Sequence, residues 1–211
     1  MIERYQYLEI EKIWNDQNKF DTWKLVEQKY LETLEENNIS PSGVSEVIGK
    51  IEVLKDEVYE REKITNHDLA SFVDVLQSKV GDNSNWIHYG LTSSDVVDTA
   101  NSLLIKQSLS ITIELLDELL LQIEAKAKQE MNTPVVGRTH GVFAETTFLG
   151  NIFGNWHQEI KRNKERLEGC VKTISVGREQ NVENWYRRLG LYGQNALSLL
   201  QVRYKCGGYS N

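Results

Sequence analysis

A long run of regularly spaced apolar residues is the feature that most limits how this chain can fold. Between Ser94 and about Met131, apolar residues recur every three or four positions, at Ile105, Leu109, Ile113, Leu116, Leu120, Ile123 and Ala127. A second stripe lies beside the first and consists of Leu104, Ile111, Leu115 and Leu119. This spacing predicts one helix of about 37 residues, roughly 55 Å long. Because the helix is apolar on two faces, we expect it to be buried in a helical bundle.

A second long helix is predicted over about residues 144–174. Its apolar stripe consists of Phe148, Ile152, Trp156, Ile160, Leu167, Val171 and Ile174. Pro134, Gly137 and Gly141 interrupt the helical pattern in residues 132–142, between the two long helices. Two neighbouring helices with broad apolar faces need further long helices to cover them, either from later in the chain or from other subunits.

Three shorter helices are predicted before the long pair. The first covers residues 21–37, with Asp21 as its capping residue. The second begins at Ser40-Pro41, a capping side chain followed by proline, and runs to about residue 62. The third begins near Asn66 and ends at Gly81, a favourable residue for a helix C-terminus.

The composition changes abruptly at Gly177. Residues 178–211 contain five Lys/Arg against two Asp/Glu, include four glycines and lack a helical stripe. The sequence therefore predicts an all-α fold in three parts. These are an N-terminal helical domain (1–92), the first part of a central long-helix bundle (93–177) and a tail of different character (178–211).

Charge and composition exclude several classes of function. The net charge of −7 argues against coating nucleic acid or binding an anionic membrane, but not against a small anionic substrate. No apolar run approaches the roughly 20 residues of a transmembrane helix, and the first residues, MIERY, do not resemble a signal peptide. The two cysteines, Cys170 and Cys206, form neither a disulfide framework nor a metal-binding pair. We expect a cytoplasmic protein.

Two of the four histidines lie where a helix is predicted to begin. His67 stands in the sequence TNHD, where free backbone N–H groups favour anions, although Asn66 or Asp68 could simply cap the helix. His88 precedes Thr92, Ser93, Ser94 and Asp95 at the start of the long helix. Thr92 and Asp95 resemble a capping box, and the same hydroxyls and amides could equally bind an anion.

His140 is the sharpest candidate for chemistry. It lies in the sequence RTHG between the two long helices, and histidine titrates near neutrality, which suits general acid or base catalysis. A structural role in the loop is the alternative. His157 follows Trp156 on a charged helix and is expected to be solvated. The sequence contains no glycine-rich phosphate loop, no zinc spacing and no Ser–His–Asp order, so no cofactor or metal is expected.

Several stretches together resemble the adenylosuccinate lyases of the fumarase/aspartase superfamily. HYGLTSSDVVDT and GRTHGVFAE are similar to the first two signature regions, MIERY is similar to the start of the bacterial enzymes, and TNHD is similar to their substrate-phosphate stretch. The similarity runs from residue 1 to about residue 177. Complete members of this family are homotetramers that share active sites between subunits.

The resemblance implies a β-elimination that releases fumarate from adenylosuccinate and from the succinylated imidazole-carboxamide ribotide of purine synthesis. It also implies roles for individual residues. Arg4, Tyr5, Asn66, His67 and Asp68 would contact the nucleotide end of the substrate. Thr92 and Ser93 would hold a carboxylate, and His140 would be the acid that protonates the departing nitrogen.

This chain departs from the family pattern in four places. Asn66 replaces a frequent arginine, Phe143 a frequent second histidine and Thr146 a frequent proline. The fourth departure is larger, because nothing in residues 178–211 resembles the serine-rich loop that supplies the family's catalytic base. A reading-frame slip near residue 178 and a genuinely shortened paralogue both explain this. A non-catalytic helical fragment or assembly module is the alternative to an enzyme.

Overall fold

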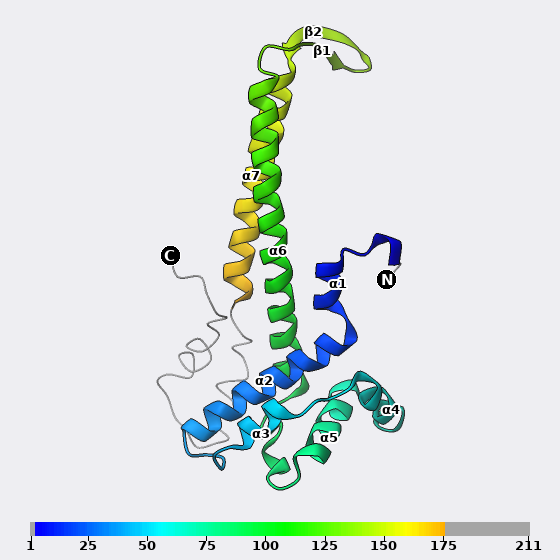
Figure 1. The fold of residues 1–211 in the computed structure, drawn as a ribbon, viewed down its shortest axis with the longest axis vertical. Coiled ribbons are helices and arrows are strands. Elements are labelled where there is room, and N and C mark those ends of the chain that lie inside the picture. The colour runs from blue at the N-terminus through cyan, green and yellow to red at the C-terminus, as the bar shows by residue number, and fades with distance from the viewer. Residues whose placement is uncertain (1–2, 176–211) are drawn as a thin grey trace. The chain divides into compact units, whose positions relative to one another are not determined.

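The computed structural model describes residues 3–175, which are mostly helical (Figure 1). In chain order the elements are η1 (Glu3–Tyr5), α1 (Leu8–Trp14), α2 (Asp16–Glu36), α3 (Val44–Lys50), α4 (Lys55–Thr65), α5 (Asp68–Val80), η2 (Ser84–Trp86), α6 (Ser93–Gln129), β1 (Pro134–Thr139), β2 (Val142–Phe148) and α7 (Leu149–Ile174). The predicted tail of residues 178–211 lies outside the described residues.

The chain divides into two compact units, which are described separately. The N-terminal unit contains the described residues up to Ile105, and the hairpin unit is Lys106–Ile174. Helix α6 begins in the first unit and ends in the second. The predicted domain boundary between residues 92 and 93 stays a prediction.

Helix α2 begins earlier than its sequence pattern predicts. Its N-cap is Asn15, whose side-chain oxygen accepts a hydrogen bond from the backbone N–H of Asn18 at 2.9 Å. The predicted cap, Asp21, lies inside the helix and accepts a hydrogen bond from Gln17, one turn earlier, at 3.2 Å. The prediction was wrong because two capping residues compete here, and the residues between them, DQNKF, continue the helix without a break.

The predicted second helix is two helices, and it does not begin at Ser40. Gly43 precedes α3 with a φ of 94°, a left-handed conformation that glycine adopts without strain. An extended segment then separates α3 from α4, and side chains of α2 bind its carbonyl oxygens. The Lys24 ammonium donates to the carbonyl of Ile51 at 2.7 Å, and the Gln17 amide donates to that of Val53 at 2.8 Å. These contacts from α2 replace the helical hydrogen bonds that a continuous helix would have made.

An aromatic cluster forms the centre of the N-terminal unit. The Phe20 ring meets the Trp23 ring edge to face at 5.3 Å and stacks on Phe72 at 6.2 Å. Phe20 and Trp23 belong to α2, and Phe72 belongs to α5, so the cluster joins these two helices. Helix α5 begins after His67 and ends before Gly81, as predicted.

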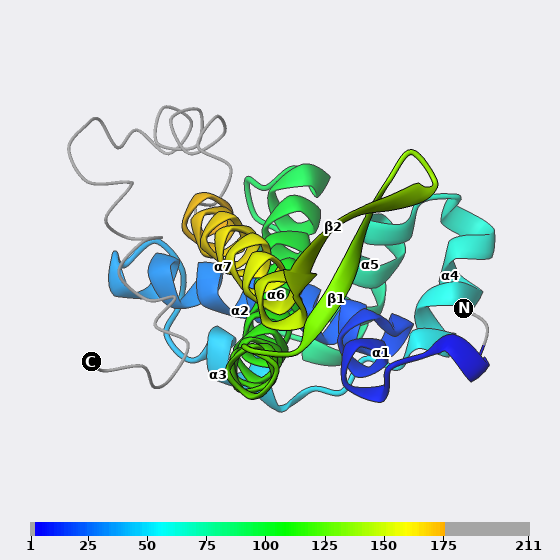
Figure 2. The ribbon, with the colours of Figure 1, turned by 90° about the horizontal axis from the view of Figure 1, so that it is seen from above.

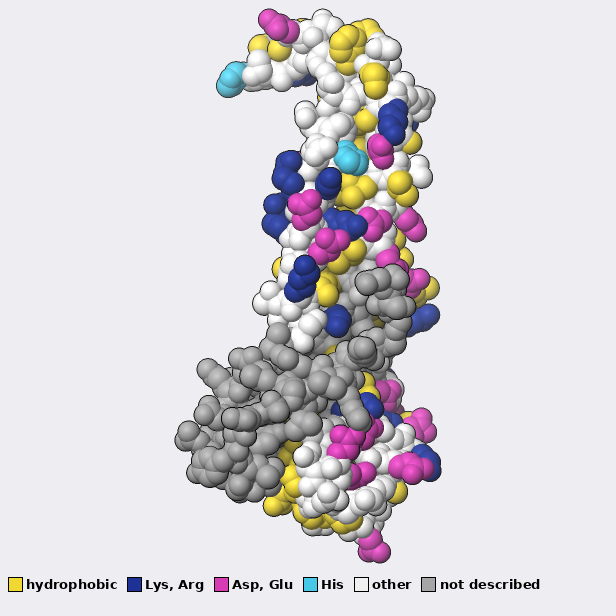
Figure 3. All heavy atoms as spheres, turned by 90° about the vertical axis from the view of Figure 1, so that its left-hand side faces the viewer, with side chains coloured by type: hydrophobic (Ala, Val, Ile, Leu, Met, Phe, Trp, Pro, Cys, Tyr) yellow, Lys and Arg dark blue, Asp and Glu magenta, His cyan; other side chains and the backbone are white. Residues whose placement is uncertain are grey.

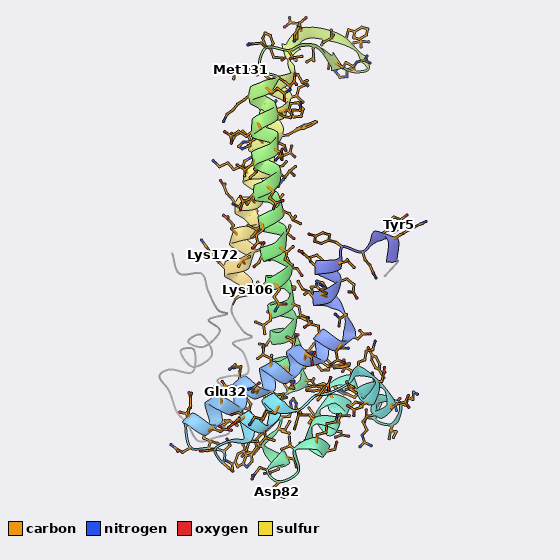
Figure 4. All side chains as sticks on the ribbon, in the orientation of Figure 1. Tyr5, Glu32, Asp82, Lys106, Met131 and Lys172 are labelled. Carbon is orange, nitrogen blue, oxygen red and sulfur yellow. The ribbon has the colours of Figure 1, made fainter. Side chains whose placement is uncertain are left out.

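In the hairpin unit, α6 and α7 run antiparallel (Figure 4). Lys106 and Lys172 lie at one end of the pair and Met131 at the other. The Lys164 ammonium of α7 bonds the Asp117 carboxylate of α6 at 2.5 Å. Helix α6 itself matches its prediction closely, while His157 is half-buried rather than solvated.

The segment between the two long helices is a β-hairpin, where the sequence pattern predicted only an interruption of the helices (Figure 2). Strand β1 pairs antiparallel with β2, and the register shifts between Val136 and Arg138. Helix α7 therefore begins at Leu149, and Phe148, expected on its apolar stripe, lies in β2. β-Branched and aromatic residues are frequent in the two strands, and they fit a pleated ribbon better than a helix.

Candidate active site

The beginning of α6 presents hydroxyl groups beside a helix N-terminus. The backbone N–H of Thr92 donates to the Asp95 carboxylate at 2.8 Å, which is half of the predicted capping box. Within residues 3–175, no hydrogen bond uses the hydroxyl groups of Thr92 or Ser93. Thr92 is exposed and Ser93 is half-buried. These two hydroxyls and the first-turn amides of the helix could bind an anion such as a carboxylate.

The TNHD stretch joins α4 to α5. Asn66 ends α4 in a left-handed conformation, with a φ of 52°. His67 is the N-cap of α5, because its Nδ1 accepts a hydrogen bond from the backbone N–H of Ala70 at 3.3 Å. The capping residue is thus His67 itself, where Asn66 or Asp68 was expected. A neutral ring that accepts at Nδ1 carries its proton on Nε2, so its outer edge is a hydrogen-bond donor.

The Asp68 carboxylate lies at the first turn of α5. It accepts a hydrogen bond from the backbone N–H of Leu69 at 2.7 Å and lies 3.5 Å from Nδ1 of His67. The side chains of His67 and Asp68 are both about half exposed. Their outer edges are therefore accessible to a ligand, in addition to their role at the helix terminus.

Arg4 and Tyr5 lie in the short helix η1. The Arg4 guanidinium stacks over the Tyr5 ring, 4.8 Å from its centroid, and the Tyr5 side chain is 69% exposed. Figure 4 labels Tyr5 on this segment. Among residues 3–175, no hydrogen bond or ion pair joins η1 to the TNHD stretch or to the start of α6. Within the described residues, these predicted site residues are therefore not linked by hydrogen bonds or ion pairs.

His140 lies at the tip of the hairpin between β1 and β2. Its φ is 49° and that of Gly141 is 76°, as in the two-residue turns that connect twisted antiparallel strands. The imidazole is exposed. Beside it, the Arg138 guanidinium lies 4.7 Å from the centroid of the Phe143 ring, its partner across the two strands. The turn thus presents the His140 imidazole to solvent, where it could transfer a proton to or from a ligand.

A buried carboxylate that was not predicted from the sequence binds the turn before α6. Glu27 on α2 is fully buried and bonds the His88 ring at 2.6 Å and the His88 backbone N–H at 3.0 Å. No local signal reveals the pair, because the two residues are 61 positions apart. A glutamate on the apolar face of a predicted helix is the one hint in the sequence, since such residues are rarely buried without a partner.

Neither a metal site nor a membrane span is found in the part of the chain that the structure describes. No group of three or more His, Cys, Asp or Glu side chains there could hold a metal ion. No helix among those residues is both long and apolar enough to cross a membrane.

The chain belongs to the lyase family, whose model matches residues 9–181. Its relatives include the adenylosuccinate lyase of Thermotoga maritima, 38% identical over 179 residues, with 84% of this chain and 42% of the relative aligned. The adenylosuccinate lyase of Bacillus subtilis is 38% identical over 190 residues, or 90% of this chain and 44% of the relative. The predicted resemblance is confirmed, and the chain spans less than half the length of these relatives.

Solved structures confirm the expected fold. The 3-carboxy-cis,cis-muconate lactonizing enzyme of Pseudomonas putida aligns with 93% of this chain and 46% of its own, with a TM-score of 0.82 and 17% identity. The fumarate lyase of Mesorhizobium sp. BNC1 aligns with 86% of this chain and 47% of its own, with a TM-score of 0.76 and 18% identity. At these identities the likeness concerns the fold alone.

Proposed function

We propose that this chain supplies the N-terminal share of an adenylosuccinate lyase active site. The observation that carries the proposal is the 38% identity to adenylosuccinate lyases over about 180 residues. The family match to residues 9–181 includes the TNHD stretch, Thr92, Ser93 and His140. The substrate would be a succinylated purine-pathway nucleotide in the cytoplasm, and no cofactor would be needed. The rest of the site would come from the segment that the relatives have beyond the aligned region.

The reaction would be a β-elimination. A base removes a proton from the methylene carbon of the succinyl group, the neighbouring C–N bond breaks, and fumarate leaves with the new double bond. His140 would give a proton to the departing nitrogen. Its imidazole is exposed at the tip of the hairpin, so a ligand can reach it. The proton balance then needs a base from outside the described residues.

The substrate carries a phosphate and two carboxylates, so the protein groups that bind it should be hydrogen-bond donors such as hydroxyls and amides. Thr92 and Ser93 would hold a carboxylate at the α6 N-terminus. The Nε2–H of His67 suits a phosphate oxygen, and Asn66 and Asp68 adjoin it. Arg4 and Tyr5 would complete the nucleotide end.

We also propose a homo-oligomer, with a tetramer as the expected form. Gly150 is the single buried residue of Lys106–Ile174, although α6 carries two apolar stripes. Leu115, Leu119 and Leu121 are 44%, 44% and 65% exposed. Figure 3 shows hydrophobic side chains among charged ones along this helix pair. Apolar surface of this extent is rarely left in water, so helices of other subunits would cover it.

A complementation experiment tests the proposed activity. The chain is co-expressed with the part of the Bacillus subtilis relative that follows the aligned region, and fumarate release from adenylosuccinate is measured. His140→Asn should lower turnover by roughly 10²–10⁴, the usual scale for a lost acid or base. Asparagine tolerates the left-handed turn, so the hairpin should persist. Thr92→Val and Ser93→Ala should mainly raise KM.

His157→Asn is the matched control, because it removes a second imidazole from the same unit and should leave turnover unchanged. Equal turnover for the two histidine variants would remove His140 from the mechanism. A folded complex of both fragments that never releases fumarate would favour the helical assembly module over the enzyme.

A further inference from the structure

Both carboxylate oxygens of Glu27 are bound to a single distant residue. Oε1 lies 2.6 Å from Nδ1 of His88, and Oε2 accepts the backbone N–H of His88 at 3.0 Å. Glu27 is fully buried, while the His88 side chain is 22% exposed. The Glu27 carboxylate therefore binds the backbone N–H and Nδ1 of His88, and the opposite edge of the ring lies near the surface.

A buried carboxylate is a poor choice if stability is its sole purpose. Removing a carboxylate from water is costly, and a well-packed apolar residue of similar volume commonly stabilises a core as well or better. The other buried side chains of α2 are apolar or aromatic, with the exception of Thr22. A role in fixing a local conformation therefore explains Glu27 better than a role in packing the core.

Glu27 binds a turn that has an unusual backbone conformation. His88 has a φ of 60° and Gly90 a φ of 76°, so the chain reverses here through left-handed conformations. For a non-glycine residue such a conformation persists when its surroundings enforce it. Tyr30, three residues after Glu27 on α2, donates its hydroxyl to the Tyr89 carbonyl at 2.9 Å. Two neighbouring side chains of α2 therefore hold residues 88–90.

The turn leads directly to the hydroxyls at the start of α6. The backbone N–H of Leu91 bonds the His88 carbonyl at 3.3 Å, and Thr92 and Ser93 follow. A carboxylate oxygen can accept a hydrogen bond from Nδ1–H, which leaves Nε2 of a neutral ring as an acceptor. In that neutral form the His88 ring would be the opposite tautomer from the His67 ring, whose Nδ1 accepts.

We propose that Glu27 is a positioning residue: it holds His88 as the Nδ1–H tautomer, fixes the left-handed turn of residues 88–90, and so places Thr92 and Ser93 for the substrate carboxylate. The last part rests on the proposed function. Tyr30 acts with it by holding the next carbonyl. Through Glu27 and Tyr30, helix α2 thereby sets the position of the turn that leads to Thr92 and Ser93.

Glu27→Gln tests the tautomer directly. A glutamine must use its oxygen to accept the His88 backbone N–H, so its amide group faces Nδ1 and donates to it. The ring proton should then move to Nε2. In the 211-residue chain with ¹⁵N-labelled histidines, we expect one of the four imidazoles to exchange its tautomer. No exchange in a folded variant would overturn the proposal.

Glu35→Gln is the matched control. Glu35 also belongs to α2, and it also binds one distant residue twice, through the Ser45 backbone N–H at 2.7 Å and the Ser45 hydroxyl at 3.0 Å. Its replacement should leave all four histidine tautomers unchanged. The same tautomer change in both variants would mean a general loss of packing and would count against Glu27.

The complemented enzyme tests the consequence for the substrate. Glu27→Gln should raise KM about tenfold with a smaller change in kcat, and Glu35→Gln should change neither. If Glu27→Gln does not fold, Tyr30→Phe should raise KM in the same direction without changing a tautomer. An unchanged KM in a folded variant would overturn the positioning role. If the complemented enzyme with Glu27 intact is inactive, the proposed function fails. The tautomer measurement still shows whether Glu27 determines which ring nitrogen of His88 carries the proton.

Discussion

Gly150, the second residue of α7, lies so close to Met131 that a Cβ atom on it would come within 2.7 Å of the Met131 Cα. The same Cβ would lie 2.7 Å from the carbonyl oxygen of Ala127. In addition, the Gly150 backbone N–H donates to the Glu130 carbonyl at 3.0 Å. The two long helices meet backbone to backbone at this point, and the hairpin emerges beside it.

Gly150→Ala should therefore destabilise the chain. Neither of the clashing atoms belongs to a flexible side chain, so α7 must shift, at a cost of about 1–3 kcal/mol for this kind of overpacking. Urea unfolding followed by circular dichroism measures the change. Gly154→Ala is the control, because no atom lies within 4 Å of its Cβ, and it should stabilise α7 by about 0.5–1 kcal/mol. Equal effects of the two variants would contradict the close approach at Gly150.

The long helix could be predicted from sequence because its signal is local and repeated. Its apolar residues, such as Ile113 and Leu120, recur with the helical period over many turns. Helix α5 was equally clear from its termini at His67 and Gly81. Boundaries of this kind depend on neighbours in the chain and not on the rest of the fold.

Other features depend on contacts between distant residues, and the sequence pattern does not contain them. The break between α3 and α4 is held by Lys24 and Gln17 of α2, and the Glu27–His88 pair spans 61 positions. The hairpin around His140 was missed for a different reason. No proline or glycine separates residues 144–148 of β2 from Leu149, the first residue of α7, so the apolar residue Phe148 fitted the helical stripe by coincidence.

Acid should weaken the contact between Glu57 and Lys79. The hydrogen bond from the Lys79 ammonium, and next the backbone N–H of Leu54, hold the pKa of the Glu57 carboxyl below its usual value. A lowered folded-state pKa stabilises the fold above the unfolded pKa, about 4.3, and this contribution is lost as pH falls through the folded value. Both side chains are partly exposed, so the contribution should be under about 1 kcal/mol.

Urea midpoints at pH 7 and pH 3.5 check this expectation. Glu57→Gln should unfold at a lower midpoint than the unchanged chain at pH 7, and the difference should shrink at pH 3.5. Glu52→Gln is the control, since Lys79 bonds the Glu52 carbonyl and not its carboxylate. A difference that is the same at both pH values would mean that the Glu57 charge contributes nothing.

The exposed leucines of α6 should drive self-association. Leu115→Glu with Leu119→Glu would place two charges on the uncovered stripe, so the chain should elute later from a size-exclusion column than the unchanged protein. Gln107→Glu with Gln122→Glu adds the same charge at two exposed polar positions of α6 and should not alter the elution volume. A clean monomer from the unchanged chain would argue against the bundle interpretation altogether.

The 211-residue chain by itself should release no measurable fumarate from adenylosuccinate. The elimination needs an acid and a base around one substrate. His140 is the acid we propose, while no stretch of the sequence resembles the serine-rich loop that supplies the base in the family. Loss of a catalytic partner together with the loop that closes over the substrate should reduce turnover far more than either loss alone. The measurement is fumarate release by the purified chain, with His140→Asn beside it. Release that disappears in the His140→Asn variant would show that this chain carries a base of its own.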